Sequence, residues 1–267
     1  MSRLRLRPQG NSGRVLHVTP ETAGWTYVGF DLHRLRPGAE AAGGEPEREA
    51  CLVLVSGKAR IAAAGQDFGV IGGRASPFEG RPDSVYVPAG APWTAVGEGP
   101  EEAVLAVCSA PGEAGRRAAR RIAPDDVTQE MRGRGSNTRH VTNILPETAE
   151  ADGLLVVEVI TPGGNTSSYP PHRHDEDDPP RQTLLEETYY HRLNPPQGFA
   201  FQRVYTDDRS LDETMLLEDG DLTLVPKGYH PCATIHGYDL YYLNVMAGPV
   251  RNWRFHNDPD HEWILQA

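Results

Sequence analysis

The fold of this chain is indicated by a stretch that occurs twice, as Val85-Tyr-Val-Pro-Ala-Gly-Ala-Pro-Trp93 and as Gly220-Asp-Leu-Thr-Leu-Val-Pro-Lys-Gly-Tyr-His230. In both copies an apolar strand ends in Val-Pro-X-Gly. In both halves an acidic residue, Glu49 or Glu187, opens an earlier strand. Because the same order recurs, we predict an all-β protein that contains one β-barrel twice.

Short strand-like runs follow one another along the whole chain. They are rich in Val, Tyr, Phe and Leu and are bounded by Gly, Pro, Asn or Asp, as strands usually are. The runs are Trp25–Leu32, Ala50–Val55, Lys58–Ala63, Ser84–Val87, Ala103–Val107, Leu154–Ile160, Thr188–Leu193, Phe199–Tyr205, Asp221–Val225 and Asp239–Met246.

Helix signals are weak, and only Gly112–Ile122 and Asp125–Arg132 are predicted as short helices. A polar, Arg-rich stretch, Arg121–Asn143, separates the two halves. We therefore predict two domains, an N-terminal barrel over residues 1–130 and a C-terminal barrel over residues 131–267.

The composition restricts the partners of the protein. Its formal net charge is −11, whereas nucleic acids and anionic membranes select a basic surface, so we predict neither as a partner. The three cysteines are odd in number and widely spaced, which predicts free thiols. No run approaches the ~18 apolar residues of a membrane span, and the N-terminus lacks the apolar stretch of a signal peptide. We expect a cytoplasmic protein.

A histidine pair in the second half is the strongest chemical signal. His172 and His174 are two residues apart in Tyr169-Pro-Pro-His-Arg-His174. Side chains alternate along an extended segment, so both imidazoles point to one face and can chelate one ion. Glu187, which opens the next strand, and His230, which follows the Val-Pro-Lys-Gly turn, complete the set. Three nitrogens and one oxygen suit Zn²⁺ or Mn²⁺, with Fe²⁺, Ni²⁺ and Co²⁺ as alternatives.

The carboxylate ligand is open between Glu186 and Glu187, because neighbours on a strand face opposite sides. We prefer Glu187, which shares a face with Tyr189 and His191 and which aligns with Glu49 of the first half.

The first half lacks the corresponding ligands. No His-X-His precedes Glu49, and the position that matches His230 is close to Trp93. We therefore predict metal ligands in the second barrel alone.

At these residues the chain resembles the cupin superfamily, whose two motifs contain His-X-His with Glu and Pro-X-Gly with His. The second half is more closely similar to the 5-deoxy-glucuronate isomerase family of bacterial inositol catabolism. The resemblance implies a duplicated cupin-type β-barrel, or bicupin. The segments that carry it are Tyr169-Pro-Pro-His-Arg-His-Asp175, Glu186-Glu-Thr-Tyr-Tyr-His191, Asn194-Pro-Pro-Gln-Gly-Phe-Ala-Phe-Gln-Arg-Val-Tyr-Thr-Asp-Asp-Arg209, Gly228-Tyr-His-Pro231, His236-Gly-Tyr-Asp-Leu-Tyr-Tyr-Leu-Asn-Val-Met-Ala-Gly248 and Phe255-His-Asn-Asp-Pro-Asp-His-Glu-Trp263.

A related family, the uronate ketol-isomerase of pectin breakdown, shares the duplicated barrel and a site of three His and one Glu. Its pattern implies the same ligands, His172, His174, Glu187 and His230. The sequence departs from the cupin pattern in one place, the acidic insert Asp175–Leu185 between the second histidine and the glutamate.

The resemblance implies conversion of 5-deoxy-D-glucuronate, an aldose acid, to 2-deoxy-5-keto-D-gluconate, a ketose acid. Such a reaction removes a proton beside a carbonyl and forms an enediolate, whose charge a metal stabilises as a Lewis acid. A base moves the proton between the two carbons. We expect Glu213 to be that base, with Asp212, a metal-bound hydroxide and Glu187 as alternatives.

A carboxylate substrate requires a basic anchor. Arg203 offers a bidentate guanidinium if its strand face points inward, and Lys227 lies beside the His230 loop. The further predicted substrate contacts are Gln202, Tyr238 and Tyr242.

Two other functions stay open on the residues alone. A cupin dioxygenase uses Fe²⁺ and a similar ligand set, and the metal spacing does not separate it from an isomerase. A non-catalytic sugar sensor normally carries a DNA-binding element, and no basic helix-turn-helix pattern is found. For the isomerase we expect a small uronic-acid-type substrate. Exposed strand edges leave a homo-oligomer open.

Overall fold

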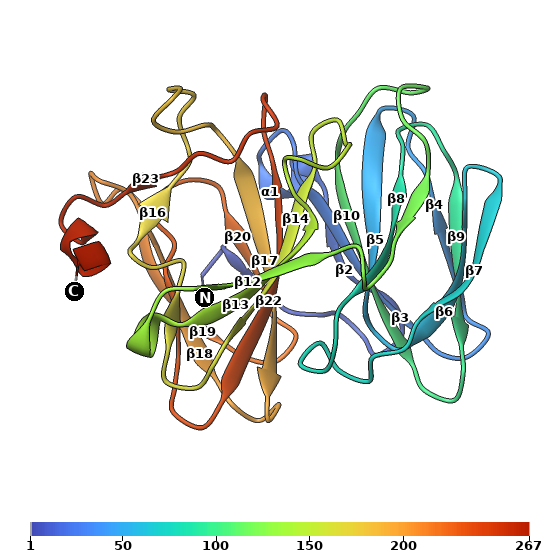
Figure 1. Cartoon of the computed structure of the whole chain (residues 1–267), viewed down its shortest axis with the longest axis horizontal. Coiled ribbons are helices and arrows are strands. Elements are labelled where there is room, and N and C mark those ends of the chain that lie inside the picture. The colour runs from blue at the N-terminus through green and yellow to red at the C-terminus, as the bar shows by residue number, and fades with distance from the viewer. Residues whose placement is uncertain (1, 267) are drawn as a thin grey trace. The chain divides into compact units, whose positions relative to one another are not determined.

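The computed structural model describes residues 2–266, which form two compact units (Figure 1). Unit 2 consists of Pro8–Thr128 and Thr142–Val157, and we call it the N-terminal barrel. Unit 1 consists of Met1–Arg7, Gln129–Val141 and Glu158–Ala267, and we call it the C-terminal barrel.

This division differs in two segments from the predicted domains 1–130 and 131–267. Residues 2–7 belong to the C-terminal barrel, because Arg5 and Leu6 pair with Thr223 and Leu222. Residues 142–157 belong to the N-terminal barrel, where Glu49 accepts hydrogen bonds from the backbone N–H groups of residues 152–154.

The N-terminal barrel contains two antiparallel sheets. The larger sheet has the order β11-β8-β5-β10-β3-β2 and the smaller one β4-β9-β6-β7. Their inward side chains form one apolar core, in which Leu52, Ile61 and Leu105 are fully buried. The strands are β2 (Gly13–Val18), β3 (Gly29–Leu35), β4 (Glu40–Gly43), β5 (Arg48–Ser56), β6 (Lys58–Ala63), β7 (Gln66–Gly72), β8 (Asp83–Val87), β9 (Trp93–Glu98), β10 (Ala103–Pro111) and β11 (Arg120–Ile122).

The C-terminal barrel repeats this plan. One sheet contains the order β1-β20-β17-β22, a second has the order β15-β21-β18-β19, and β16 pairs with β23. The elements are β1 (Arg5–Leu6), β15 (Thr166–Ser167), β16 (His172–Arg173), β17 (Glu186–Asn194), β18 (Ala200–Tyr205), β19 (Asp212–Leu217), β20 (Leu222–Val225), β21 (Cys232–Thr234), β22 (Asp239–Ala247), β23 (His256–Asn257) and the 3₁₀ helix η2 (Glu262–Gln266).

The chain between the barrels forms three strands and a short turn of 3₁₀ helix. These are β12 (Thr128–Arg132), η1 (Gly135–Asn137), β13 (Arg139–Leu145) and β14 (Leu155–Thr161). Strands β13 and β14 each run from one unit into the other.

The all-β prediction is confirmed, and each of the ten predicted strand runs overlaps an observed strand. Both predicted helices are wrong, because Gly112–Ile122 ends in β11 and Asp125–Arg132 ends in β12. Arg121 donates two hydrogen bonds, of 2.9 and 2.6 Å, to Asp83 of the neighbouring strand β8. This cross-strand ion pair outweighs the helix propensity of the Ala- and Arg-rich run.

The described residues contain one α-helix, α1 (Pro20–Ala23), outside the predicted helices. Its N-cap is Thr19, and Gly24 ends it in the left-handed conformation with φ 73°. Among residues 2–266, no helix has the length and apolar character of a membrane span.

Candidate metal centre

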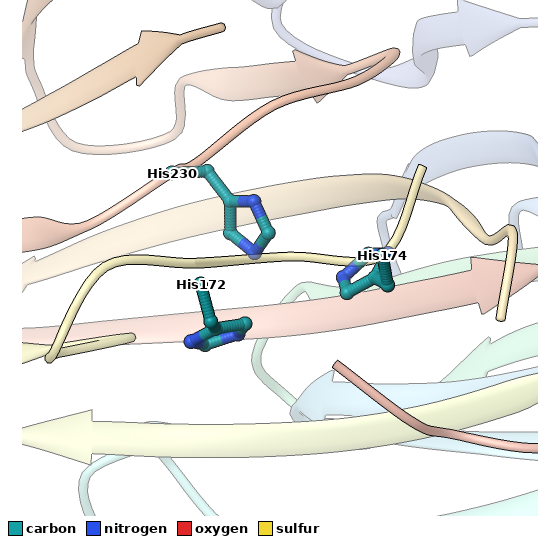
Figure 2. A group of neighbouring side chains, drawn as sticks. All are labelled: His172, His174 and His230. Carbon is teal, nitrogen blue, oxygen red and sulfur yellow. The ribbon is translucent and has the colours of Figure 1, made fainter. Parts of the chain in front are cut away.

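Three imidazoles converge at one end of the C-terminal barrel (Figure 2). His172 lies in β16, His174 follows that strand, and His230 lies in the turn between β20 and β21. Their ligand nitrogens all lie within 4.8 Å of one another. Figure 2 shows the three rings around a common space, reached from segments that are far apart in the sequence.

Backbone carbonyls orient the three rings. The Nδ1 atoms of His172, His174 and His230 lie 3.4, 3.0 and 2.8 Å from the carbonyl oxygens of Pro170, Leu185 and Gly228 respectively. An imidazole that donates its Nδ1–H to a carbonyl keeps a lone pair on Nε2, which is the tautomer that a metal ligand requires. The rings are therefore held ready to coordinate through Nε2.

The structure places the carboxylate of Glu187, a predicted ligand, beside two of the three imidazoles. Its Oε2 atom lies 3.1 Å from Nε2 of His174 and 3.1 Å from Nε2 of His230. Its other oxygen accepts a hydrogen bond from the side-chain amide of Asn244. Glu186 lies on the opposite face of β17, so the structure brings Glu187 and not Glu186 to the histidines.

The charge balance of the cluster favours a cation. Burial opposes ionisation of Glu187, but His230 and His174 lower the pKa of its carboxyl to about 2. Burial lowers the pKa of His172 and His230, which keeps both rings neutral. Burial also acts to lower the pKa of His174, but the Glu187 carboxylate raises it overall. The negative charge of Glu187 attracts a proton or a metal ion to this point.

The donor set fits a divalent metal ion. Nε2 of His230 is buried and makes no hydrogen bond, although Glu187 Oε2 lies 3.1 Å away. A buried nitrogen of this kind is uncommon unless a ligand satisfies it. Three imidazole nitrogens and one carboxylate oxygen suit zinc, manganese and similar ions, with positions left for substrate oxygens.

The acidic insert between His174 and Glu187 does not separate them in space. The backbone N–H of Leu185 donates to the carbonyl of His174 at 2.8 Å, so the insert closes into a loop. At the start of this loop, Asp175 accepts a hydrogen bond of 2.7 Å from the backbone N–H of Gly228. The loop therefore connects both histidine segments.

Gly228 shapes the turn that presents His230. Its φ is +88°, and a Cβ atom there would lie 2.4 Å from the carbonyl oxygen of Tyr205. A side chain is excluded both by the conformation and by the space. The carbonyl of Gly228 is also the acceptor for Nδ1 of His230, so the glycine and the ligand form one unit.

A buried polar layer lies beside the histidines. Nε2 of His191 lies 3.3 Å from Gln202 Oε1 and 3.2 Å from Thr223 Oγ1. The amide of Gln202 donates to the carbonyl of His230 at 3.3 Å. Burial lowers the pKa of His191 to about 3, so this ring is neutral. Gln202 is thus brought to the site as predicted, although it holds the backbone of a ligand rather than facing it as a free amide.

Tyr242 packs against Tyr189, which lies beside the histidine cluster. Its ring centroid lies 4.9 Å from that of Tyr189, which in turn lies 5.8 Å from that of His230. The hydroxyl of Tyr189 is 3.1 Å from Ser168 Oγ. Burial raises the pKa of both tyrosines, so both stay protonated.

Glu213 lies on the inner face of the second sheet. It pairs with Val204, and Val204 stands opposite His230, because Tyr205 bridges Tyr229 and Gln202 pairs with Cys232. Oε2 of Glu213 is buried and has no hydrogen-bond partner among the described residues. Glu213 and His230, a predicted ligand, therefore lie at matching positions on either side of Val204 in this sheet.

The other predicted residues are placed elsewhere. Arg203 lies on the outer face of β18 and forms a bidentate ion pair with Asp212, at 2.8 and 2.7 Å. Lys227 is exposed in the turn before Gly228. Tyr238 packs closely against Gly198, because a Cβ atom on that glycine would lie only 2.2 Å from the tyrosine ring. These positions do not support roles for Arg203, Lys227 and Tyr238 in this site.

The C-terminal segment supplies residues that are missing from the predicted site. Strand β23 pairs with β16, and the ring of Phe255 lies 4.6 Å from the ring of His172. Asp258 accepts a hydrogen bond from the hydroxyl of Tyr205 at 2.7 Å and donates its own N–H to the carbonyl of Pro171. The C-terminal segment therefore contacts the His172 ring and is hydrogen-bonded to the residue before it and to Tyr205. Nothing in its local sequence indicates these contacts.

Known proteins share both the sequence and the fold. The model of the KduI/IolB family matches residues 4–264. A 5-deoxy-glucuronate isomerase of Geobacillus kaustophilus is 53% identical over 270 residues, covering 100% of this chain and 97% of the relative. A protein of the same description from Geobacillus thermodenitrificans is 54% identical over 256 residues, with 96% and 92% covered.

Solved structures agree with this picture. The crystal structure of an IolB-like protein from Salmonella typhimurium matches with a TM-score of 0.96 and 52% identity, over 99% of this chain and 100% of that one. The oxalate decarboxylase of Lactobacillus farciminis matches with a TM-score of 0.67 and 14% identity, over 100% and 91%. The second likeness concerns the fold alone and confirms the predicted duplicated cupin-type barrel.

Proposed function

This chain belongs to the KduI/IolB family, and on that basis we propose that it is a 5-deoxy-glucuronate isomerase of inositol catabolism with a metal centre in its C-terminal barrel. The function is carried by the relatives of that description, which are 53% and 54% identical over nearly the full length. The observation that carries the metal centre is the meeting of Glu187 Oε2 with two imidazoles at 3.1 Å each.

His172, His174, Glu187 and His230 would hold the ion. Once bound, a divalent ion supplies a Lewis acid that withdraws electrons from the carbonyl and the adjacent hydroxyl of the substrate. Zinc or manganese suits these ligands best. The chain itself presents the Nε2 lone pairs, keeps Glu187 ionised through Asn244, and encloses the site in buried side chains.

Aldose–ketose isomerisation moves one proton between neighbouring carbons. The proton leaves the carbon that bears the hydroxyl and is returned to the former carbonyl carbon, while the hydroxyl proton passes to the carbonyl oxygen. No atom or electron is gained or lost. We assign the carbon-to-carbon transfer to Glu213, because its Oε2 is buried, has no described hydrogen-bond partner and faces inward on the level of His230.

We also assign the protein to the cytoplasm, where free thiols persist. Cys51, Cys108 and Cys232 are all buried and unbridged in the structure.

The test is proton NMR of 5-deoxy-D-glucuronate with the metal-loaded protein in D₂O, alongside a chelator-treated sample. We expect loss of the C1 signals of the aldose, metal dependence, and deuterium at the new hydroxymethyl carbon. An unchanged spectrum with the loaded protein would refute the isomerase, and oxygen consumption would point instead to a dioxygenase.

The base is tested by Glu213→Gln, with Asp212→Asn as its matched control on the opposite face of β19. Loss of a general base costs about 10²- to 10⁴-fold in kcat, so we expect a loss of that size for Glu213→Gln and less than about threefold for Asp212→Asn. Equal rates in the two variants would remove Glu213 from this role.

A further inference from the structure

The proposed substrate carries a carboxylate that must find a positive partner as it leaves water. The two cations expected to supply it are placed elsewhere, since Arg203 is already paired with Asp212 and Lys227 is exposed in a turn. Arg173, close to the histidines, is also paired, with Asp175 at 2.8 Å and Glu176 at 3.1 Å. Arg203 and Arg173 are thus already paired with carboxylates, and Lys227 is exposed to solvent.

Arg139, at the start of β13, is different. Its side chain is partly buried, and Nη1 donates to the carbonyl oxygen of Asn137 at 3.0 Å. Within residues 2–266, no carboxylate forms an ion pair with it, and burial accordingly lowers its pKa. A guanidinium stays charged in proteins, so this positive charge is partly desolvated and lacks the anion that normally accompanies it.

Two routes of neighbouring groups lead from Arg139 to the histidines, and each begins with an electrostatic interaction. On the first, its charge acts on Tyr242, whose ring lies 4.9 Å from that of Tyr189. Tyr189 lies 5.8 Å from His230, ring to ring. This route runs along the inner face of β17 and β22, because Tyr189 and Tyr242 stand on neighbouring inward positions.

The second route runs along the C-terminal segment. Arg139 acts electrostatically on Arg132, whose guanidinium lies 5.4 Å from the ring centroid of Trp253. The ring of Trp253 lies 6.3 Å from that of Phe255, and Phe255 lies 4.6 Å from His172. Both series of neighbouring groups lead from Arg139 to the histidines within the C-terminal barrel.

The loop before β13 is built around this guanidinium. A Cβ atom on Gly133, whose φ is +77°, would lie 2.7 Å from Nη1 of Arg139 and 2.0 Å from the carbonyl of Asn137. The side chain of Asn137 donates to the carbonyl of Tyr169 at 3.0 Å. The support of Arg139 is thereby fastened to the segment that leads into His172.

We propose that Arg139 binds the carboxylate of the substrate, while the carbonyl end lies at the three histidines and Glu187. This inference rests on the proposed function and names the residue that makes the site selective for a sugar acid over a neutral sugar. An arginine suits this role because its planar donors match both oxygens of a carboxylate.

The test compares Arg139→Met and Arg139→Lys with the control Arg203→Met. Each is assayed with 5-deoxy-D-glucuronate and with the neutral analogue in which CH₂OH replaces the carboxylate. For Arg139→Met we expect KM for the acid to rise by roughly 100-fold, with less than a threefold change in kcat/KM for the analogue. Arg139→Lys should lie between, and Arg203→Met should resemble the wild type. An equal loss on both substrates, or an unchanged KM for the acid, would overturn the proposal.

A binding experiment keeps this proposal separate from the proposed function. Calorimetry measures D-glucuronate and D-glucose binding to the metal-loaded wild type, to Arg139→Lys and to Arg139→Met. We expect the acid to bind more tightly than the neutral sugar in the wild type, and this preference to be lost in Arg139→Met. If the wild type prefers the acid but does not isomerise, only the proposed function fails. If the wild type shows no preference, or Arg139→Lys and Arg139→Met both keep it, the Arg139 proposal fails even in an active isomerase.

Discussion

The N-terminal and C-terminal barrels use one strand plan for two purposes. Val87 and Val225 each precede the proline of Val-Pro-X-Gly, and their partners across the sheet are Ala50 and Glu187. At the position where one barrel has Glu187, the proposed metal-site carboxylate, the other has the methyl group of Ala50. The two barrels therefore differ in their side-chain chemistry at single inward positions and not in their strand plan.

The same register extends along the strand. Two and four residues after Ala50 and Glu187, the N-terminal barrel has Leu52 and Leu54, where the C-terminal barrel has Tyr189 and His191. All four side chains are buried. Leu52 and Leu54 belong to an apolar core, whereas Tyr189 and His191 belong to the polar layer beside the ligands.

The corresponding end of the N-terminal barrel is not filled completely. It holds a cavity of about 330 Å³ whose lining includes His17, Asp31, His33 and Trp93. Within the described residues, the only cluster of potential metal ligands that converges is the one at His172, His174 and His230. Polar side chains around a barrel cavity are therefore not sufficient for a metal site, because their donor atoms must also lie close to one another.

The comparison also corrects the predicted alignment of Glu49 with Glu187. Glu49 stands one residue earlier and corresponds to Glu186, on the outer face, because a shift of one residue reverses the side of a strand. Its carboxylate accepts the hydroxyl of Tyr86 and the backbone N–H groups of residues 152–154, at 2.6 to 2.8 Å for the three amides. Glu49 is thus a structural residue on the outer face, and the counterpart of the ligand candidate Glu187 is Ala50.

The largest difference between the barrels should appear on removal of one histidine from each. His230→Ala takes away a buried ligand, and we expect loss of bound metal and at least about a 1000-fold loss of kcat, since the Lewis acid goes with it. His33→Ala in the N-terminal barrel should keep both within about threefold. Metal analysis and turnover check this, and an active His230→Ala protein would break the comparison.

Glu49→Ala should affect stability and leave chemistry alone. The change leaves three backbone donors, one buried and two partly buried, and the buried Tyr86 hydroxyl without their acceptor. One unsatisfied buried group costs about 1–3 kcal/mol. We expect the free energy of unfolding to fall by about 3 kcal/mol or more, with turnover per folded molecule unchanged. Urea unfolding measures the first and active-site titration the second. A stable protein that has lost its metal would instead place Glu49 among the ligands.

The equivalent glycines of the two Val-Pro-X-Gly turns give a matched pair. A Cβ atom on Gly228 would lie 2.4 Å from a backbone carbonyl, whereas one on Gly90 would lie 3.2 Å from the Ala114 side chain and 3.5 Å from the Pro46 carbonyl oxygen. Both have positive φ, which costs roughly 1–2 kcal/mol with a side chain. We expect Gly228→Ala to lose more stability than Gly90→Ala and, in addition, to weaken metal binding about 10-fold or more. Thermal unfolding and metal titration would show this; equal effects would contradict it.

The smallest expected effect concerns pH. The pKa of His191 is about 3 in the folded protein and near its ordinary value of about 6.5 when unfolded. The unfolded state therefore binds more protons below about pH 6.5, and stability falls as the pH falls through this window. His191→Leu, which copies Leu54, should remove about 1–2 kcal/mol of the stability change of the metal-free protein between pH 6.5 and 5. Parallel urea titrations test this, and an identical pH dependence in both proteins would speak against a buried neutral ring.

Alternation and turn chemistry carried most of the sequence prediction. They were sufficient for the strands, for the shared face of His172 and His174, and for the turn that presents His230. The geometry agrees with Glu187 as the carboxylate. The insert after His174 did not disturb the site, because Leu185 closes it onto His174 through the backbone, a contact without any local signal.

Long-range pairing decided the rest. Of the neighbours Gln202 and Arg203 on β18, only one can point inward. Phe201 and Tyr205 alternate with Arg203, and these aromatic residues led to the wrong prediction that the face with Arg203 is the inner one. Asp212, which holds Arg203 on the outside, lies on the next strand. Arg139 has its neighbours at Tyr242 and, through Arg132, at Trp253, so no spacing in the sequence could indicate it.

The central claim is that one barrel binds a metal ion and the other does not. The most direct measurement is the metal content per chain after loading with Zn²⁺ or Mn²⁺ and gel filtration, for the wild type and for His172→Ala/His174→Ala. The account predicts one ion per chain in the wild type and none in the double variant. Two ions per chain in the wild type, or one retained in the double variant, would contradict it.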